Sequence, residues 1–372
     1  MATVLTPPIE QVQEAAPQPR PARSERSTAL DAYRGLIMIL LVSTGFGFGA
    51  LKQHPIWGHV AHQVDHVAWE GLVLWDLIQP AFMFMVGVAM PFSFAKRAAQ
   101  GAGFGANFGH VAWRAVVLVF LSQLFTAVQS NKFEFGLINV LSQIAFTYTL
   151  SFLIMQLPFV WQAVSAAALL GLHWGLFLAF PASGGAFAQT GNIGQVIDQW
   201  LLGRNYSGYY VTINFISSTV TTLAGVWAGL LLRSERTQME KLRIIVFSAL
   251  GCLAGGLALA LVNPMVKRIW TPSFTIYSLG WVLLGLAAML WLVDMRGYRR
   301  LAFPMVVVGM NSIFAYCVFQ LCRGGIHRAV GVFTGKFEWI GTLAPVLHAT
   351  ATFGVIWYVC HWLYQRRVFI KV

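Results

Sequence analysis

Long apolar stretches, separated by short polar connections, dominate the chain. A helix needs about 20 mostly apolar residues to cross a bilayer core, and these stretches lack the alternation of polar and apolar positions that membrane barrel strands show. The pattern predicts an all-α polytopic membrane protein with about ten transmembrane helices in one bundle. The expected spans are 35–51, 72–94, 109–130, 137–156, 159–181, 209–232, 242–262, 274–293, 303–321 and 346–364.

Composition supports an integral membrane protein. Hydrophobic residues make up 57% of the chain and charged residues 10%, whereas soluble domains carry about 25% charged residues. The formal net charge of +12 is compatible with a nucleic-acid partner. However, with a cytoplasmic N-terminus most of the 25 lysines and arginines fall in cytoplasmic connections, as the positive-inside rule requires. We therefore expect both termini in the cytoplasm and no nucleic-acid partner.

The two ends of the expected organisation differ in character. Residues 1–28 are rich in Pro, Ala, Gln and Arg and contain no apolar core, which predicts a disordered cytoplasmic tail rather than a cleaved signal. Residues 29–372 show no short-period repeat and are expected to form a single transmembrane domain.

One short stretch, HQVDHVAWEGLVLWDLIQP, concentrates titratable groups between apolar segments. Asp76 falls within the second span, where a carboxylate costs about 2.5–3.5 kcal/mol on insertion scales unless it is paired or faces a wet cavity. It is either a functional group or a polar anchor between helices.

His66 is the natural candidate for a general base, because imidazole titrates near neutral pH. In one continuous helix His66 and Asp76 would lie about 15 Å apart. They can cooperate only if the chain bends between them, and Gly71 is the residue that would permit the bend. The alternative is a solvated histidine in an outward loop.

A metal site is the rival interpretation of the same stretch. Histidine and carboxylate side chains are ligands that zinc accepts. No recognised ligand motif is present, so we predict no metal. The spacing of His62, Asp65 and His66 could place ligands on one helical face, and His54 and His59 are nearby in the sequence.

Further polar residues interrupt or flank apolar runs. Arg34, in DAYRGL, either extends to the lipid interface or binds an anionic group. Asn311, in GMNSIFAY, is either a polar link between helices or a cavity-lining group, and Gln143 poses the same choice. Lys267 and Arg268 lie in an outward connection, against the charge trend, which suggests a function.

Five segments, in this order, resemble one known family. They are LDAYRGLIMILLV, HVAWEGLVLWDLIQPAFMFMVGVAMPFS, STVTTLAGVWAGLLLR, KRIWTPSFTIYSLGW and VDMRGYRRLAFPMVVVGMNSIFAY. The chain resembles the heparan-alpha-glucosaminide N-acetyltransferase family and its bacterial homologues over most of residues 30–316.

The resemblance implies a membrane-bound acyltransferase, which fits a bacterial cytoplasmic (inner) membrane. Such enzymes take an acetyl group from cytoplasmic acetyl-CoA and deliver it to a sugar or amino sugar at the other face. The family's His-x-x-Trp-x-Gly-Leu motif places the catalytic histidine on His66, and its Asp-Leu-x-x-Pro motif places the acidic residue on Asp76. Asn311 matches the family's Gly-Met-Asn-Ser segment, and Trp270 its Trp-Thr-x-Ser segment.

The remaining site residues follow from charge placement and from these matches. The acyl-CoA contacts are predicted at Arg34, Asn311, Arg299 and Arg300. The acceptor contacts are predicted at Trp69, Glu70, Lys267 and Trp270. The other expected partners are the lipid bilayer and a second copy of the chain in a homodimer.

Departures from the family and one alternative function remain. Gly45 stands where the family has Asn, and Ser142 and Gln143 stand where it has a Gln-Arg pair. The alternative is a transporter of a small polar solute, with His66 and Asp76 as a proton relay. In a third interpretation, a membrane scaffold, the polar groups only hold helices together.

Overall fold

The computed structural model describes residues 27–335 and 338–370, and for residues 338 and 339 it describes the backbone only. The tail expected at residues 1–28 therefore lies outside the described residues, except for its last two positions. Helices form nearly all of the ordered structure in the described ranges, and strand pairing there is limited to isolated bridges. The prediction of an all-α protein is confirmed.

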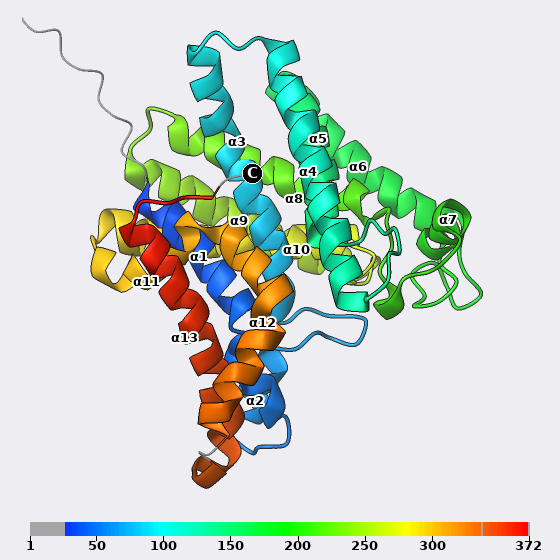
Figure 1. Cartoon of the computed structure of the whole chain (residues 1–372). Helices are drawn as coiled ribbons and strands as arrows, with labels where there is room; N and C mark the ends of the chain where they lie inside the picture. Colours follow the sequence, from blue (N-terminus) through cyan, green and yellow to red (C-terminus); the bar gives the residue numbers. More distant parts are fainter. Residues whose placement is uncertain (1–26, 336–337, 371–372) are drawn as a thin grey trace, which may run out of the picture.

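The helices follow one another along the chain as drawn in Figure 1. The first half contains α1 (Thr28–Val42), η1 (Gly45–Leu51), α2 (Gly58–Gln63), η2 (Leu74–Leu77), α3 (Ile78–Ala99), α4 (Phe104–Ser130), α5 (Val140–Ile154) and α6 (Phe159–Ala179). The second half contains α7 (Ile193–Leu202), η3 (Ser207–Tyr209), α8 (Asn214–Arg233), α9 (Gln238–Ala260), α10 (Pro272–Met289), η4 (Leu290–Met295), α11 (Arg299–Met310), α12 (Ser312–Thr334), η5 (Glu338–Leu343) and α13 (Ala344–Gln365).

In the described part of the chain, eight helices are long and apolar enough to cross a membrane, or nine if α11 and α12 count as one bent span. This supports a polytopic membrane protein. The one expected span without a long helix is 137–156, which corresponds to α5, an apolar helix of only 15 residues. By length alone α5 falls short of a full crossing.

The expected straight span at 303–321 is wrong in its geometry. The chain breaks at Asn311, where α11 and α12 meet at an angle of 67°. α12 then continues to Thr334, far beyond the expected end. The buried Asn311 side chain donates to Val368 O (3.1 Å) and accepts from the Ile370 N–H (3.0 Å). The break is therefore held by the C-terminal segment.

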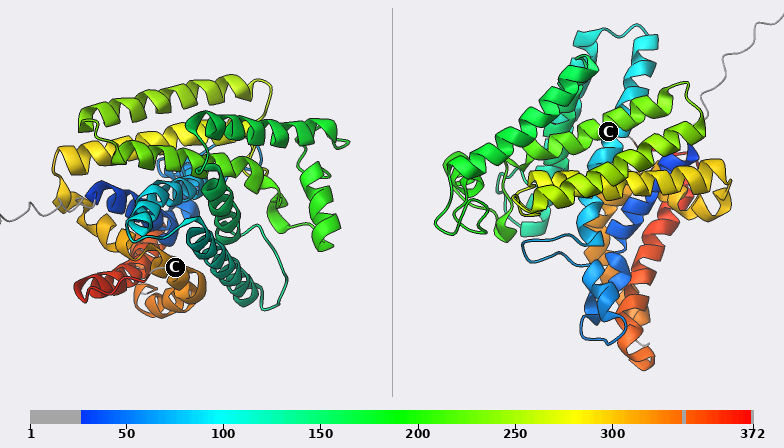
Figure 2. Two further views of the ribbon diagram at one scale, coloured as in Figure 1. Left: turned by 90° about the horizontal axis from the view of Figure 1, so that it is seen from above. Right: turned by 180° about the vertical axis from the view of Figure 1, so that it is seen from behind.

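Pairs of closely packed helices organise the bundle. α3 packs along α8, α9 along α10, and α1 along α11. Both views in Figure 2 show α9 and α10 side by side on one face of the molecule. At the α3–α8 crossing, a Cβ on Gly87 would lie 1.9 Å from Thr222 O, and one on Gly225 would lie 2.1 Å from Phe84 O. Small residues thus bring the two backbones into contact, as is common between membrane helices.

Gly225→Leu is expected to lower the unfolding temperature of the purified protein in detergent. The new side chain would meet the backbone of α3, and overpacking typically costs about 1–3 kcal/mol or more. Gly251→Leu on α9 is the matched control, because no atom lies within 4 Å of a Cβ built there. Equal unfolding temperatures for the two variants would contradict the close crossing.

Buried hydroxyl groups link α8 to its neighbours. Ser217 Oγ lies 2.7 Å from Thr275 Oγ1 of α10, and Thr222 Oγ1 donates to Thr147 Oγ1 of α5 at 3.1 Å. Side chains with short polar groups can pair across helices where water is excluded. α8 is therefore the central helix against which the site-bearing α3 and α5 are fixed.

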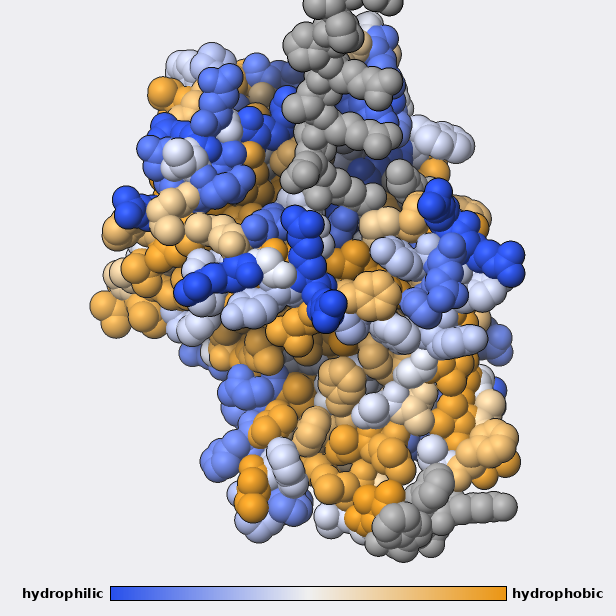
Figure 3. All heavy atoms as spheres, turned by 90° about the vertical axis from the view of Figure 1, so that its left-hand side faces the viewer, coloured by the Kyte–Doolittle hydropathy of each residue, from blue (hydrophilic) through white to orange (hydrophobic). Residues whose placement is uncertain are grey.

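The two ends of the described chain lie on one side of the molecule (Figure 1). Ser27 Oγ–H and the Ala29 N–H both donate to Asp294, at 2.7 and 3.1 Å, and tie the start of α1 to η4. In Figure 3 apolar side chains dominate the lower half of the visible face, and polar ones gather above them. Such an apolar zone fits contact with lipid.

Candidate functional site

The segment before α3 is bent at Gly71, as the pairing of His66 with Asp76 required. Gly71 adopts a φ of +115°, a conformation that is open to glycine. Its N–H donates to Met265 O at 2.9 Å, and Glu70 forms an antiparallel bridge with Val266. These backbone contacts join two connections that are far apart in the sequence. They bring the residue after Val266, Lys267, to the start of α3.

His66, Asp76 and Lys267 form one cluster. His66 Nδ1 lies 2.6 Å from Asp76 Oδ1, and Lys267 Nζ donates to the same oxygen at 3.3 Å. Asp76 and Lys267 are buried, with 1% and 5% of their surfaces exposed, whereas the His66 side chain is 39% exposed. The carboxylate is thus shared between a buried cation and an imidazole that remains accessible.

The contacts of the carboxylate fix the state of the imidazole. A carboxylate can only accept, so the 2.6 Å contact is favourable only when Nδ1 carries the proton and donates it. In the neutral ring Nε2 is then unprotonated and free to accept a proton. His66 is therefore held in the tautomer that a general base needs.

Lys267 lies in an environment that favours the uncharged form of its side chain. Burial lowers its pKa to about 8, and the nearby Asp76 carboxylate opposes that change. At neutral pH the ammonium group stays charged and offsets the buried carboxylate. Its Nζ also lies 3.4 Å from His66 Nδ1, so the three groups respond to one another's charge.

The connection that carries Lys267 is held firmly. Trp270 is fully buried and adopts a left-handed conformation with φ +56°. His173 Nε2–H of α6 donates to Ile269 O at 2.8 Å, and Thr271 Oγ1 accepts from the Val266 N–H at 3.0 Å. A strained residue persists only where its surroundings fix it. The connection therefore acts as a rigid support for the Lys267 side chain.

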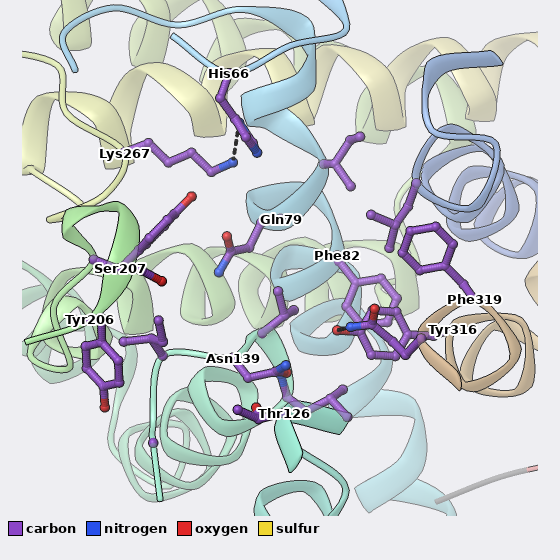
Figure 4. A pocket seen from close by; sticks show the side chains of 18 of the residues that line it. His66, Gln79, Phe82, Thr126, Asn139, Tyr206, Ser207, Lys267, Tyr316 and Phe319 are labelled. Carbon is purple, nitrogen blue, oxygen red and sulfur yellow. Dashed lines mark hydrogen bonds between the residues drawn. The ribbon is translucent and has the colours of Figure 1, made fainter. Parts of the chain in front are cut away.

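A cavity of about 490 Å³ opens beside the cluster. Figure 4 shows His66 and Lys267 at one end, Gln79 below them, and Asn139 with Thr126 at the other end. The lining combines polar groups with apolar surface from several helices. Its other members include Trp75, Phe82, Glu134, Arg204, Tyr206, Tyr210, Tyr316, Phe319 and Gln320.

A buried polar chain connects this cavity to the interior. Gln79 Nε2 donates to Gln143 Oε1, and Gln143 Nε2 donates to Asn214 Oδ1 and Ser218 Oγ, each at 3.0 Å. Gln143 is therefore a polar link between α5 and α8, and Gln79 is the member that faces the cavity. The Gln79 amide that lines the cavity is therefore positioned through contacts with α5 and, beyond it, α8.

The residues predicted to contact the acceptor lie in different surroundings. Lys267 belongs to the cluster and lines the cavity. Trp69 donates its indole N–H to Phe187 O at 3.1 Å and meets the Tyr209 ring edge-on. Glu70 is exposed and contributes backbone pairing. Trp270 is packed against Phe274 and does not line the cavity, so it lies away from the surface where an acceptor would bind.

The residues predicted to bind the donor do not meet in one place. Arg34 Nη2 donates to Asp31 Oδ1 at 3.2 Å on α1. Arg299 and Arg300 are exposed at the start of α11. Asn311 is fully buried, and its amide is engaged by the C-terminal backbone. The donor contacts remain a prediction.

Several residues that line the cavity were not predicted from the sequence. Gln79 had a visible indication, because it is a lone amide in an apolar span. Tyr206 and Tyr210 had none, since they come from the long connection before α8. Tyr206 Oη accepts from the Leu137 N–H at 2.8 Å, which fixes one wall of the cavity.

The rival metal ligands have other contacts in the structure. Asp65 pairs with Lys52, and His54 Nδ1 accepts from the backbone N–H groups of Ile56 and Trp57, both at 3.2 Å. Within the described ranges, no group of three or more His, Cys, Asp or Glu side chains is arranged to hold a metal ion.

Two curated proteins are similar to nearly the whole chain. Human (Homo sapiens) heparan-alpha-glucosaminide N-acetyltransferase is 22% identical over an alignment that covers 93% of this chain and 60% of that enzyme. The mouse (Mus musculus) enzyme of the same name is 21% identical, with 96% and 62% covered. The chain thus spans about three fifths of the length of these relatives. No protein-family model matches it.

This chain is a distant relative of the heparan-alpha-glucosaminide N-acetyltransferases. The similarity extends across its membrane helices and confirms the family resemblance seen in the motifs.

Proposed function

We propose that the protein is a membrane-bound acyltransferase. It moves an acetyl or related acyl group from cytoplasmic acyl-CoA to a sugar or amino sugar at the outer face of the membrane. The observation that carries the proposal is the His66–Asp76 pair, whose imidazole keeps a free Nε2 at the end of the 490 Å³ cavity. The distant relationship to named N-acetyltransferases supports the same reaction class.

The proposed reaction uses His66 in both directions of proton transfer. Nε2 removes the proton from the acceptor amine or hydroxyl as that atom attacks the thioester carbonyl carbon. The carbon–sulfur bond then breaks, and the imidazolium returns the proton to the departing CoA thiolate. General acid–base help of this kind is typically worth about 10²–10⁴-fold in rate.

Asp76 and Lys267 support the imidazole in this scheme. Asp76 holds the Nδ1 proton and offsets the positive charge that develops on the ring. Lys267 stabilises the ionised form of the buried Asp76 carboxylate, because its ammonium group offsets the negative charge. The amide and hydroxyl groups along the cavity, such as Gln79 and Asn139, are suited to the hydroxyl groups of a sugar.

We place the donor entrance on the cytoplasmic side, with both termini in the cytoplasm. The support is the distribution of basic residues over the connections. Arg299 and Arg300 are exposed there and are proposed to meet the CoA phosphates.

Acetyl-CoA is expected to raise the unfolding temperature of the protein in uncharged detergent, because a ligand that binds only the folded state stabilises it by mass action. The shift should fall when Arg299 and Arg300 are both changed to Gln. Acetate is the control ligand and should give no shift. An unchanged unfolding temperature at millimolar acetyl-CoA would argue against a CoA-dependent enzyme.

The transfer rate is expected to fall as the pH rises through about 8. The pKa of Lys267 is lowered to about 8, so the side chain loses its charge above that value and Asp76 loses its buried counter-charge. The rate at saturating donor, measured from pH 6.5 to 9.5 and corrected for thioester loss without enzyme, tests this. A rate that stays constant to pH 9.5 would exclude a role for the Lys267 charge.

A further inference from the structure

A second cavity of about 550 Å³ lies apart from the His66 cluster. It is formed where the end of α1 and η1 meet the later part of α12 and the start of α13, toward the lower end of the molecule in Figure 1. Its lining is Thr44, Gly47, Gly49, Ala50, Arg323, His327, Thr334, Gly335, Ala344, Pro345, His348 and Ala349. Nothing in the proposed transfer reaction uses these residues.

Arg323 gives this cavity a permanent positive charge. Its Nη2 donates to Thr44 Oγ1 at 3.3 Å, and its guanidinium lies 5.5 Å from the centre of the Phe319 ring. No aspartate or glutamate is among the described residues that line the cavity. A guanidinium without a lining carboxylate favours an anionic ligand and disfavours a metal ion.

Two histidines add donors that an anion can recruit. The rings of His327 and His348 stack with centres 3.9 Å apart. Thr352 Oγ1–H donates to His348 O at 2.9 Å, so its oxygen accepts from His327 Nδ1–H at 3.3 Å. His348 Nε2–H donates to His327 O at 2.9 Å. In the neutral rings, His327 Nε2 and His348 Nδ1 therefore carry no proton.

Protonation of either ring would add a cation next to Arg323. Two protonated imidazoles in a stack repel each other, and the guanidinium adds to that repulsion. An anion beside the stack, next to the Arg323 guanidinium, would offset this repulsion and accept from the new N–H donors. Among the described side chains, the titratable groups that line the cavity are Arg323 and His327 from α12 and His348 from α13, while α1 and η1 contribute only uncharged residues.

We propose that this cavity binds a phosphate group carried on a larger molecule. A phosphate offers three strong acceptor oxygens and close to two negative charges near neutral pH, which suits a guanidinium and two imidazoles. The cavity is larger than a phosphate needs, so an attached organic group fits as well. A phospholipid headgroup and a soluble phosphate ester share this chemistry.

Calorimetric titration with inorganic phosphate at pH 6, in uncharged detergent, tests the proposal. Wild-type protein should bind phosphate, and Arg323→Gln should weaken binding about tenfold or more, because a charged hydrogen-bond donor is lost. Arg328→Gln is the matched control, since this exposed arginine of the same helix does not line the cavity.

A second arm separates the two sources of phosphate. Wild-type protein and Arg323→Gln are placed in bilayer discs with a small fraction of phosphatidic acid in phosphatidylcholine, and bound lipid is measured by native mass spectrometry. Selective retention of phosphatidic acid by the wild type identifies a lipid headgroup. Phosphate binding without lipid retention identifies a soluble ester. If Arg323→Gln does not fold, His348→Gln replaces it in both arms.

Two results would overturn the proposal. One is equal phosphate binding by wild type and Arg323→Gln together with equal lipid retention. The other is the absence of both phosphate binding and selective lipid retention in the wild type. His66→Ala should leave phosphate binding unchanged, so failure here is separate from failure of the acyltransferase proposal.

Discussion

His66→Ala is expected to reduce acyl transfer by about 10²–10⁴-fold, because it removes the group that takes and returns the proton. The side chain is 39% exposed and adds little to the core. The variant should therefore fold normally and bind acyl-CoA as the wild type does. Initial rates at saturating donor, with the unfolding temperature measured on the same sample, test both parts.

His62→Ala is the matched control for this substitution. His62 is also exposed and lies at the end of α2, but it does not line the cavity. Its loss should change the rate less than twofold. If His62→Ala abolished transfer while His66→Ala retained most of it, the assignment of the base would be wrong.

Asp76→Asn is expected to lower both the stability and the transfer rate. Asparagine keeps the size of the side chain, but it leaves Lys267 buried without a counter-charge. Removing one partner from a buried ion pair typically costs about 3–5 kcal/mol. The amide can also rotate and present its NH₂ group to His66 Nδ1, which would favour the wrong tautomer. We expect a rate loss of about 10²-fold or more.

A second substitution separates the two effects. In the double variant Asp76→Asn, Lys267→Met, no charge is left unpaired between the two positions, so much of the lost stability should return. The transfer rate should stay low, because the orientation of His66 is not restored. Recovery of activity in the double variant would show that Asp76 acts only through stability.

The sequence predicted the elements around the site better than the contacts within it. An apolar span with an isolated aspartate marked Asp76 as costly, and Gly71 marked where the chain could bend. Neither showed that Lys267, 191 positions after Asp76 in the chain, would complete the cluster. That contact depends on the backbone pairing of Glu70 and Gly71 with the connection before α10. Such pairing leaves no pattern in side-chain polarity.

Hydropathy also concealed the break at Asn311. The residues on both sides are apolar, so a sliding window predicts one continuous span. The break depends on a tertiary contact, in which the Asn311 amide binds the backbone near Val368 and Ile370. The same limitation explains the roles of Asn311 and Gln143. Their buried amides needed partners, but only the fold shows whether a partner is protein or ligand.

Transfer of labelled acetyl groups into sealed vesicles tests the central claim most directly. Wild-type protein is reconstituted into vesicles that contain glucosamine, and labelled acetyl-CoA is added outside. Labelled N-acetylglucosamine should accumulate inside vesicles with the wild type and stay at the protein-free level with His66→Ala. Equal amounts of labelled product inside vesicles with the two proteins, or none inside vesicles with the wild type, would contradict transfer through the His66–Asp76 site.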